Sequence, residues 1–526
     1  MLRWKLCVLL ISFAAAIPVP SMAQEPYDLL IRNGRVLDGT GTPWFYADIA
    51  ISGDRIVAVG NLAGARARRV IDATGLYVSP GFIDVHTHAA DGLEKPGLSA
   101  AIPLLTQGIT TAVINPDGGG PVDLAEQRAT MERLGIGVNA AQLVPHGSVR
   151  RAVLGMQDRA PTDAELERMK QLVRAGMEEG AFGMSSGLYY APGSYADIEE
   201  VIELSKVVAE YDGVYTSHVR DEADYNIGVV AALDEVIQIA KEAHIPGIHT
   251  HIKVLGPRVW GYSLALIEHI ERARRDGIEV WADQYPYEAS GTSIVGALVP
   301  RWALVGGEDS LEYRIETPSE RARLRADMLE NLDRRGGADR LQFQSAADPR
   351  YEGMTLQEVA DLNGMEPVDM AIELLKSGGG GLVSFNMSER DVELLMQQPW
   401  TMTSSDGGIA EMGHRKPHPR FYGAFPRKIR KYVKEEGVID LATAIRSMTY
   451  TSATVFRLKD RGIIRPGAIA DIVVFDLDRL TDKATYDDPH QLSEGMIHVL
   501  VNGRFAIEDE QMAETMYGKV LSRLHD

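Results

Sequence analysis

Short apolar runs with a period-two alternation, broken by turn residues, occupy both ends of the chain. They lie at residues 29–34, 47–51, 55–59, 467–475 and 498–503. Runs of this length, bounded by Asn-Gly or Gly-Asp pairs, are typical of β-strands joined by tight turns. Asn33 and Gly34, for example, predict a turn between two strands. We therefore predict one small β-sandwich lobe, built from residues 24–80 and residues 456–526.

The middle of the chain, residues 81–455, alternates between strand-like and helix-like segments. After an opening strand that begins at Gly81, the predicted strands are residues 108–114, 137–145, 181–186, 213–218, 247–254, 277–287 and 401–405. The predicted helices are residues 162–179, 195–212, 226–243 and 263–276. Thr162 and Glu165 form a capping box at the start of the first of these helices. This alternation predicts parallel β/α units and hence a (β/α)8 TIM-like barrel.

Residues 293–350 do not follow this alternation. A Thr-Pro-Ser-Glu stretch at residues 317–320 opens a charged helix there. We interpret residues 293–350 as a lobe or lid inserted late in the barrel. The glycine run at residues 378–381 is interpreted as a flexible loop, because it lacks the Lys-Ser/Thr pair of a phosphate-binding loop.

Composition narrows the class of protein and of partner. The length of 526 residues suggests two or three lobes rather than one core. Apolar residues make up 45% and charged residues 24%, which is the balance of a soluble globular protein. The formal net charge of -20 disfavours nucleic acid and anionic membranes as partners, because an acidic surface repels both. The oligomeric state stays open.

Residues 1–23 have the pattern of a signal peptide. Arg3 and Lys5 form a positive segment, residues 6–17 are apolar, and a small-residue cleavage site ends at Ala23. We therefore expect an exported protein, periplasmic or secreted after cleavage near Ala23. The single cysteine, Cys7, lies inside the apolar segment, so the mature chain would carry neither a thiol nor a disulfide.

Two histidines stand at the end of the first barrel strand. His86 and His88 are two residues apart, so on a strand their side chains face the same side. Two neutral imidazoles in this arrangement form half of a divalent-metal site. Taken alone, the pattern fits a pair of buried or surface histidines equally well.

Other predicted strands end in residues that can complete such a site. These residues are Asp117, His218, His251 and Asp406. In a barrel of this type the reactive groups gather at the carboxyl ends of the strands. Several imidazoles together with carboxylates are the ligand set of a hydrolytic Zn²⁺ site. Asp117 also fits the role of a Pro-Asp-Gly turn residue, and Asp406 that of a helix cap.

Two further histidines have the same chemistry. His244 precedes its predicted strand and therefore lies at the wrong end for the site. His249 lies two residues before His251, so alternation turns it to the same side. We interpret His249 as a structural residue deeper in the barrel.

Several motifs along the chain carry a resemblance. Residues 78–88 (VSPGFIDVHTH) resemble the first-strand motif of the amidohydrolase superfamily. Further motifs, in order along the chain, resemble the D-aminoacylase family of N-acyl-D-amino-acid deacylases. They are QGITT at 107–111, SGLYY at 186–190, SHVR at 217–220, THIK at 250–253, DQYPY at 283–287, SSDG at 404–407 and PHPRFYG at 417–423. The resemblance covers nearly the whole chain after residue 23.

The resemblance implies a role for each candidate ligand. It implies that His86 and His88 share one metal subsite with Asp406, and that His218 and His251 belong to the other subsite. Where this family has a bridging cysteine in an Asn-Cys-Gly motif, the present chain has Asp117. A carboxylate is a harder ligand than a thiolate, so Mn²⁺ or Co²⁺ stand beside Zn²⁺ as candidates for the one or two ions. A carboxylated lysine is not expected, because no lysine ends residues 181–186.

The resemblance also implies hydrolysis of the amide bond of N-acyl-D-amino acids. Asp406 would take a proton from the attacking water and return it to the leaving amine. The residues that match the family's carboxylate-binding groups are Lys253, Arg420 and Tyr190, with Tyr285 as a fourth candidate. Without the motifs, the two cations could equally pair with surface carboxylates, and the tyrosines could be core aromatics. The expected partner is a small molecule with a free carboxylate.

Two alternative functions remain open at this point. A dipeptide with a C-terminal D-residue is also an N-acyl amino acid, so a dipeptidase fits the same residues. A non-catalytic protein of the amidohydrolase fold, acting by binding, is the second alternative.

Overall fold

The computed structural model describes residues 26–524. The predicted export segment, residues 1–23, lies outside the described residues. Across the described part of the chain, every helix is too short or too polar to traverse a lipid bilayer.

Strands from the two ends of the chain form one continuous sheet. The strands of the N-terminal part are β1 (Tyr27–Val36), β2 (Phe45–Ser52), β3 (Arg55–Gly60), β4 (Ala67–Asp72) and β5 (Tyr77–Pro80). Those of the C-terminal part are β18 (Ile472–Phe475), β19 (Met496–Val501), β20 (Arg504–Glu508) and β21 (Gln511–Met512). The order is β21-β20-β19-β18-β5-β1-β2-β3, with β4 on β1, and antiparallel β5 and β18 join the two parts. The predicted lobe from both chain ends is thus confirmed as a β-sheet.

The predicted turn at Asn33 and Gly34 is wrong. β1 runs through both residues, and the pairing of β1 with β2 shifts between Ile31 and Gly34. Asn33 adopts a left-handed backbone with φ of 61°. Asparagine tolerates this conformation, so the Asn-Gly pair makes a β-bulge inside one strand instead of a hairpin turn.

The central part of the chain contains two parallel sheets. One has the order β6-β7-β8 and the other β17-β13-β12-β11-β10-β9. The strands are β6 (Phe82–Asp84), β7 (Ile109–Ile114), β8 (Asn139–Gln142), β9 (Val144–Pro145), β10 (Gly183–Gly187), β11 (Val214–His218), β12 (Gly247–His249), β13 (Val280–Gln284) and β17 (Thr401–Thr403). Every pairing within these two sheets is parallel, which confirms the predicted β/α units.

Helices follow the strands as the periodicity predicts. They include α1 (Ala90–Leu93), α2 (Ile102–Leu105), α3 (Leu124–Leu134), α4 (His146–Leu154), α5 (Asp163–Glu178), α6 (Ile198–Ala209), α7 (Val229–Ala243) and α8 (Ser263–Arg275). α14 (Glu389–Met396) precedes the last parallel strand, β17. After β17 come α15 (Arg420–Arg427), the π-helix η5 (Lys428–Glu435), α16 (Leu441–Met448) and α17 (Tyr450–Val455). The capping box at Thr162 and Glu165 is confirmed at the start of α5. Met169, Val173 and Met177, spaced by four residues, form the buried face of α5.

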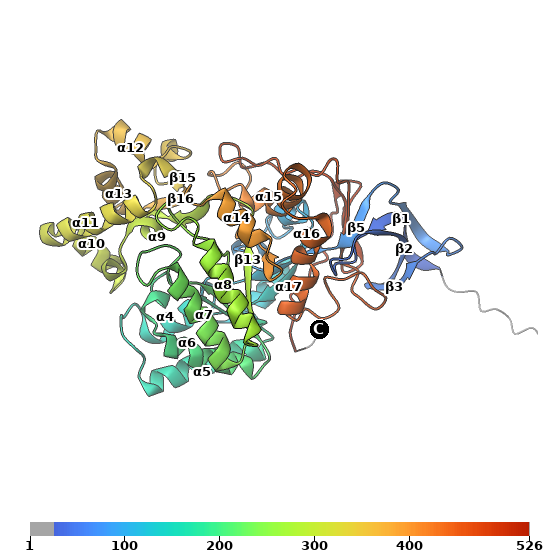
Figure 1. Ribbon diagram of the computed structural model, residues 1–526, viewed down its shortest axis with the longest axis horizontal. Coiled ribbons are helices and arrows are strands. Elements are labelled where there is room, and N and C mark those ends of the chain that lie inside the picture. The colour runs from blue at the N-terminus through green and yellow to red at the C-terminus, as the bar shows by residue number, and fades with distance from the viewer. Residues whose placement is uncertain (1–25, 525–526) are drawn as a thin grey trace, which may run out of the picture.

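An inserted lobe separates β13 from β17. Its strands β14 (Ser290–Ser293), β16 (Gly380–Ser384) and β15 (Leu341–Ala346) form an antiparallel sheet in that order. Its longer helices are α9 (Ile294–Leu298), α10 (Glu308–Glu316), α11 (Pro318–Arg334), α12 (Leu356–Asn363) and α13 (Pro367–Leu375). One hydrophobic cluster, from Ile294 to Leu382, holds the lobe together. Figure 1 places the lobe and the terminal sheet at opposite ends of the molecule, with the β/α units between them.

The inserted lobe is larger than residues 293–350. Its hydrophobic cluster continues to Leu382, because β16 pairs with both β14 and β15. Gly380 and Gly381 belong to β16, so the expected flexible loop at residues 378–381 is in part a strand. The predicted end at residue 350 is too early, because α12 and α13 are amphipathic like the helices around the parallel sheets and were not recognised as part of the lobe.

Candidate metal centre

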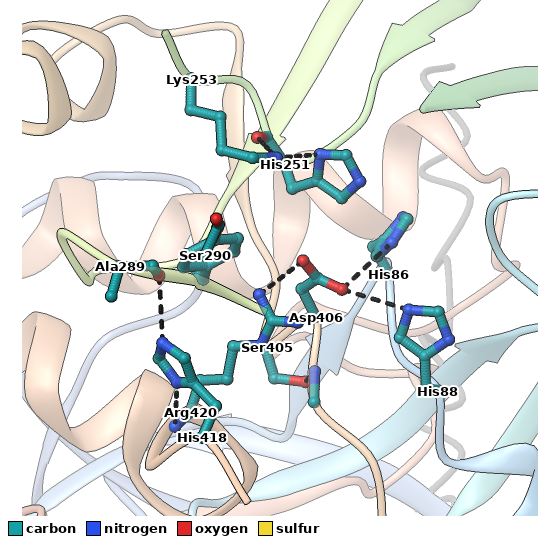
Figure 2. A network of polar contacts seen from close by, with 12 residues as sticks. His86, His88, His251, Lys253, Ala289, Ser290, Ser405, Asp406, His418 and Arg420 are labelled. Atoms are coloured by element: carbon teal, nitrogen blue, oxygen red, sulfur yellow. Dashed lines mark hydrogen bonds and ion pairs between the residues drawn. The ribbon is translucent and has the colours of Figure 1, made fainter. Parts of the chain in front are cut away.

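The six predicted ligands converge at the carboxyl ends of the parallel strands. His86 and His88 follow β6, Asp117 follows β7, His218 ends β11, His251 follows β12 and Asp406 follows β17. Figure 2 shows Asp406 directed toward both histidines of the first pair and toward Arg420. Five separate strand ends thus contribute to one centre, as expected for this arrangement.

Four of these residues form a first group of possible ligands. The Oδ1 atom of Asp406 lies 3.6 Å from Nε2 of His86 and 3.2 Å from Nε2 of His88. The carboxylate of Asp117 lies 3.4 Å from Nε2 of each of these histidines. One ligand atom from each of the four residues falls within 4.8 Å of the others, which is close enough to surround one ion.

Asp117 also belongs to a second group, with His218 and His251. Its Oδ1 atom lies 3.7 Å from Nδ1 of His218 and 3.5 Å from Nε2 of His251. Asp117 therefore lies between the two groups, in the bridging position that the resemblance implies for it.

The donor atoms fit a divalent cation. Nε2 of His86, Oδ1 of Asp117 and Nδ1 of His218 are buried and have no hydrogen-bond partner in the described part of the chain. Buried polar atoms are nearly always satisfied, so a cluster of unsatisfied lone-pair donors indicates a ligand between them. Imidazole nitrogens with carboxylate oxygens are the donor set of zinc, manganese and cobalt sites.

The carboxylates and the cationic groups of the centre favour each other's charged forms. Burial opposes ionisation of Asp406, but Arg420 and His251 outweigh it and hold the pKa of that carboxyl well below its usual value. Burial is likewise outweighed at Asp117, where His86 lowers the pKa most. Conversely, burial and Lys253 both act to lower the pKa of His251, yet Asp406 and Asp117 raise it to about 9. The carboxyls of the centre are thus held ionised, as the carboxylate ligands of a metal ion must be.

A layer behind the ligands, which the sequence did not single out, holds the loops in place. Asp84 accepts hydrogen bonds from both the backbone N–H and the hydroxyl of Ser405, next to Asp406. Burial raises the pKa of Asp84 to about 7. Asp283 accepts a bond of 2.9 Å from the backbone N–H of His251. Both aspartates lie in motifs of the sequence, but each is part of a strand. Without the fold, the sequence does not show whether such a carboxylate binds the metal or supports a neighbouring ligand.

The centre opens into a cavity of about 610 Å³. Its lining includes His88, Asp117, His218, His251 and Asp406. It also includes all four predicted carboxylate-binding residues, Tyr190, Lys253, Tyr285 and Arg420. The predicted site residues are therefore brought together around one space, except that the buried His86 is not among the residues that line it.

The two predicted cations are paired with carboxylates of the site. Nη1 of Arg420 donates to Oδ2 of Asp406 at 2.7 Å, while its Nε atom has no partner among the described residues. The guanidinium lies over the ring of Tyr285, 4.7 Å from the centroid. Nζ of Lys253 donates to the carboxylate of Glu222 at 2.5 Å. Glu222 was not predicted from the sequence. The hydroxyl of Tyr285 is directed to the sulfur of Met387 rather than to the centre.

His249 does not face the same side as His251. β12 ends at His249, and His251 follows in a turn with φ of 37°. Within the sheet His249 pairs with Ala282, which packs in the cluster containing residues of α7 and α8. The alternation rule fails here because it holds only while the strand continues. Burial lowers the pKa of His249 to about 3, so it is neutral and outside both ligand groups.

Comparisons with known proteins agree with this geometry. A family model described as the amidohydrolase family matches residues 69–507. The chain is 35% identical to an N-acyl-D-glutamate deacylase of Alcaligenes xylosoxydans xylosoxydans, over 91% of this chain and 93% of that protein.

Two solved structures share the fold. One is an N-acyl-D-glutamate deacylase from Bordetella bronchiseptica, complexed with zinc and a phosphonate inhibitor that mimics the tetrahedral intermediate. It has a TM-score of 0.81 and 33% identity, covering 95% of this chain and 100% of its own. The other is a D-aminoacylase, studied for the functional role of its binuclear metal centre. It has a TM-score of 0.81 and 32% identity with the same coverage. The mixed α/β fold with its terminal sheet is therefore common to this chain and both deacylases.

Proposed function

The chain belongs to the amidohydrolase family, and from this premise we propose that it hydrolyses N-acyl-D-amino acids to a carboxylate and a free D-amino acid. It is a metal-dependent hydrolase of the N-acyl-D-amino-acid deacylase type with a buried histidine and aspartate site. The identity of the substrate is the part that we propose.

One contact supports the proposal most directly: Arg420, a buried cationic residue that lines the cavity, bonds Asp406, the predicted acid/base residue. Nη1 of Arg420 lies 2.7 Å from Oδ2 of Asp406, whose other oxygen faces the ligand histidines. In an N-acyl amino acid a single carbon separates the amide nitrogen from the carboxylate. A group that protonates the nitrogen must therefore lie beside the group that binds the carboxylate, as these two residues do.

Each residue of the centre has a separate role in the hydrolysis of the amide bond. A bound divalent ion supplies water activation and polarisation of the amide carbonyl. Asp406 accepts the proton of the attacking water and returns it to the nitrogen of the leaving amine. Arg420 binds the substrate carboxylate through its remaining N–H groups, and Tyr190 and Lys253 also line the cavity.

We propose Zn²⁺ at this centre, with Mn²⁺ or Co²⁺ as the alternatives, in one or both ligand groups. The carboxylate of Asp117 in the bridging position supports the harder ions beside zinc. Metal analysis of the purified protein decides among them.

We also infer that the two parallel sheets complete one eight-stranded barrel over residues 81–455. At one seam the backbone N–H of Asp406 donates to His86 and that of His88 donates to Gly407, at 2.9 and 2.7 Å. At the other, Leu143 alone separates β8 from β9. Export to the periplasm or medium, with cleavage near Ala23, remains a proposal from the sequence, which cell fractionation tests.

Hydrolysis of matched substrate pairs tests the function. The metal-analysed mature protein is assayed with N-acetyl-D- and N-acetyl-L-amino acids and with dipeptides ending in a D-residue. We expect release of the free D-amino acid from the N-acetyl-D-compounds, and a loss of about 10²- to 10⁴-fold in kcat for Asp406→Asn. Cleavage of the dipeptides alone would identify a dipeptidase, and no turnover by metal-loaded protein would refute the proposal.

A further inference from the structure

Glu222 lies behind the second ligand group, in the loop that follows β11. Its side chain is 3% exposed. Its Oε1 atom lies 3.2 Å from Nδ1 of His251, and its Oε2 atom lies 3.6 Å from Nε2 of His218. One carboxylate therefore faces both histidines of the group.

Glu222 and Asp117 face opposite edges of the two imidazole rings. His251 has Nε2 toward Asp117 and Nδ1 toward Glu222. His218 has Nδ1 toward Asp117 and Nε2 toward Glu222. A histidine binds metal through one nitrogen only when the other carries the proton, and an acceptor beside that proton fixes the tautomer and the ring orientation. Glu222 is placed to be this acceptor for His251, while Nε2 of His218, 3.6 Å away, has no hydrogen-bond partner among the described residues.

Lys253 competes for the same carboxylate. Its Nζ atom lies 2.5 Å from Oε1 of Glu222 and 2.6 Å from Nδ1 of His251. At 2.6 Å the ammonium donates to an unprotonated Nδ1; once an ion occupies Nε2, the proton moves to Nδ1, and both groups are then donors that need an acceptor. When Nδ1 of His251 carries its proton, Glu222 accepts from both groups and sets the position of Lys253 on the cavity wall.

We propose that Glu222 is a positioning residue that links the His218 and His251 metal subsite to the substrate-binding Lys253. Its carboxylate presents the free nitrogen of His251 to the ion, faces the outer edge of His218, and holds the lysine at the carboxylate end of the substrate. The part that concerns Lys253 rests on the proposed function, and the part that concerns the histidines does not.

Zinc titration of metal-depleted protein tests the metal part without any substrate. We expect Glu222→Gln to weaken zinc binding about 10- to 100-fold, the usual effect of losing an acceptor behind a ligand. His218→Ala should change the same part of the isotherm. Glu222→Asp, which keeps the charge on a shorter side chain, should fall between the wild type and Glu222→Gln.

Glu200→Gln is the matched control. Glu200 is equally buried and also bonds a histidine and a cation, His146 and Arg150, but it contacts none of the candidate ligands. Its substitution should leave the zinc isotherm unchanged. Folding of each variant is checked by circular dichroism, and Glu222→Asp carries the test if Glu222→Gln does not fold. An unchanged zinc isotherm for folded Glu222 variants would overturn the proposal.

Kinetics test the link to Lys253. With zinc at saturation, we expect Glu222→Gln to raise KM for an N-acetyl-D-amino acid by about tenfold, with a smaller change in kcat. If zinc binding weakens but KM at saturating zinc stays at the wild-type value, the link to Lys253 is refuted. If no variant, wild type included, turns over this substrate, the proposed function fails while the zinc result stands.

Discussion

Three of the candidate ligands hold backbone conformations that ordinary residues avoid. Asp117, His251 and Asp406 have φ values of 55°, 37° and 49°. Such conformations cost roughly 1–3 kcal/mol each and persist where the surrounding structure fixes them. The N–H of Asp406 is bonded to the carbonyl of His86, and that of His251 to Asp283. These left-handed residues follow the strand ends, and their side chains lie in the common centre.

Arg420 should be required for binding the substrate carboxylate. Arg420→Lys keeps the charge but loses the planar fork that reaches Asp406 and a carboxylate together. We expect kcat/KM for an N-acetyl-D-amino acid to fall about 10- to 100-fold, the equivalent of one lost charge-assisted hydrogen bond. Arg427→Lys is the control, since Arg427 lies on the same helix α15 but stacks on Tyr287 outside the cavity. Equal losses in both variants would contradict this role.

Lys428 should make stability depend on pH. Its side chain is 1% exposed and bonds only the hydroxyls of Thr403 and Ser447 among the described residues, so burial lowers its pKa from 10.5 to about 7. The unfolded chain then binds more protons between pH 7 and 10.5, and stability rises with pH across that window. Below pH 7 the cost of the buried ammonium is fully present.

Lys428→Met should therefore stabilise the protein most at low pH. We expect a gain on the order of 2 kcal/mol at pH 6 that shrinks as the pH approaches 10.5, because the wild-type lysine becomes neutral. Thr403 and Ser447 keep each other as hydrogen-bond partners at 3.0 Å. Urea unfolding at several pH values measures the effect, and a gain that is independent of pH would refute the explanation.

The sequence identified which residue types meet in the centre but not how they meet. His86, His88 and Asp406 were predictable because motifs and strand ends mark them. Glu222 was missed because it follows His218 by four residues in a loop, where spacing carries no information about direction. The facing direction of His249 was mispredicted because the left-handed residue at His251 ends the alternation.

At the scale of elements, sequence signals within a few residues predicted where helices begin, but they did not predict where the inserted lobe ends. The capping box that opens α5 satisfies two backbone donors through side chains only three residues apart in sequence. The end of the inserted lobe depends instead on β16, which pairs with strands about 40 and 90 residues earlier in the chain. Pairing between strands so far apart cannot be predicted from the residues of a short stretch of sequence.

The cap of α5 provides a direct test at this scale. Thr162→Ala removes the hydroxyl that accepts from the backbone N–H of Glu165. We expect a loss of about 1 kcal/mol in the free energy of unfolding. Gln171→Ala changes an exposed position inside the same helix and should cost less than 0.5 kcal/mol. Chemical denaturation compares the two variants, and equal changes would show that the cap contributes nothing.

At the scale of the whole molecule, the metal centre joins segments that are far apart in the chain. Its ligands come from the ends of β6, β7, β11, β12 and β17, which belong to two different sheets. An ion held by these residues would cross-link the two sheets at one edge, where the carboxylates and imidazoles lie within 4.8 Å of one another in each ligand group. The sequence could predict the alternation of strands and helices, but the union of the sheets through this centre follows only from the fold.

Removal of the metal should accordingly lower the stability of the entire protein. An ion that binds only the folded state adds about 2.7 kcal/mol when its free concentration is 100 times its Kd. We expect chelation to lower Tm by several degrees and added Zn²⁺ to restore it. His86→Ala should blunt this response, because His86 belongs to the first ligand group. His269→Ala should keep it, because His269 pairs with Asp234 away from the centre. An equal rise in Tm with zinc for His86→Ala and the wild type would place the stabilising ion elsewhere in the protein.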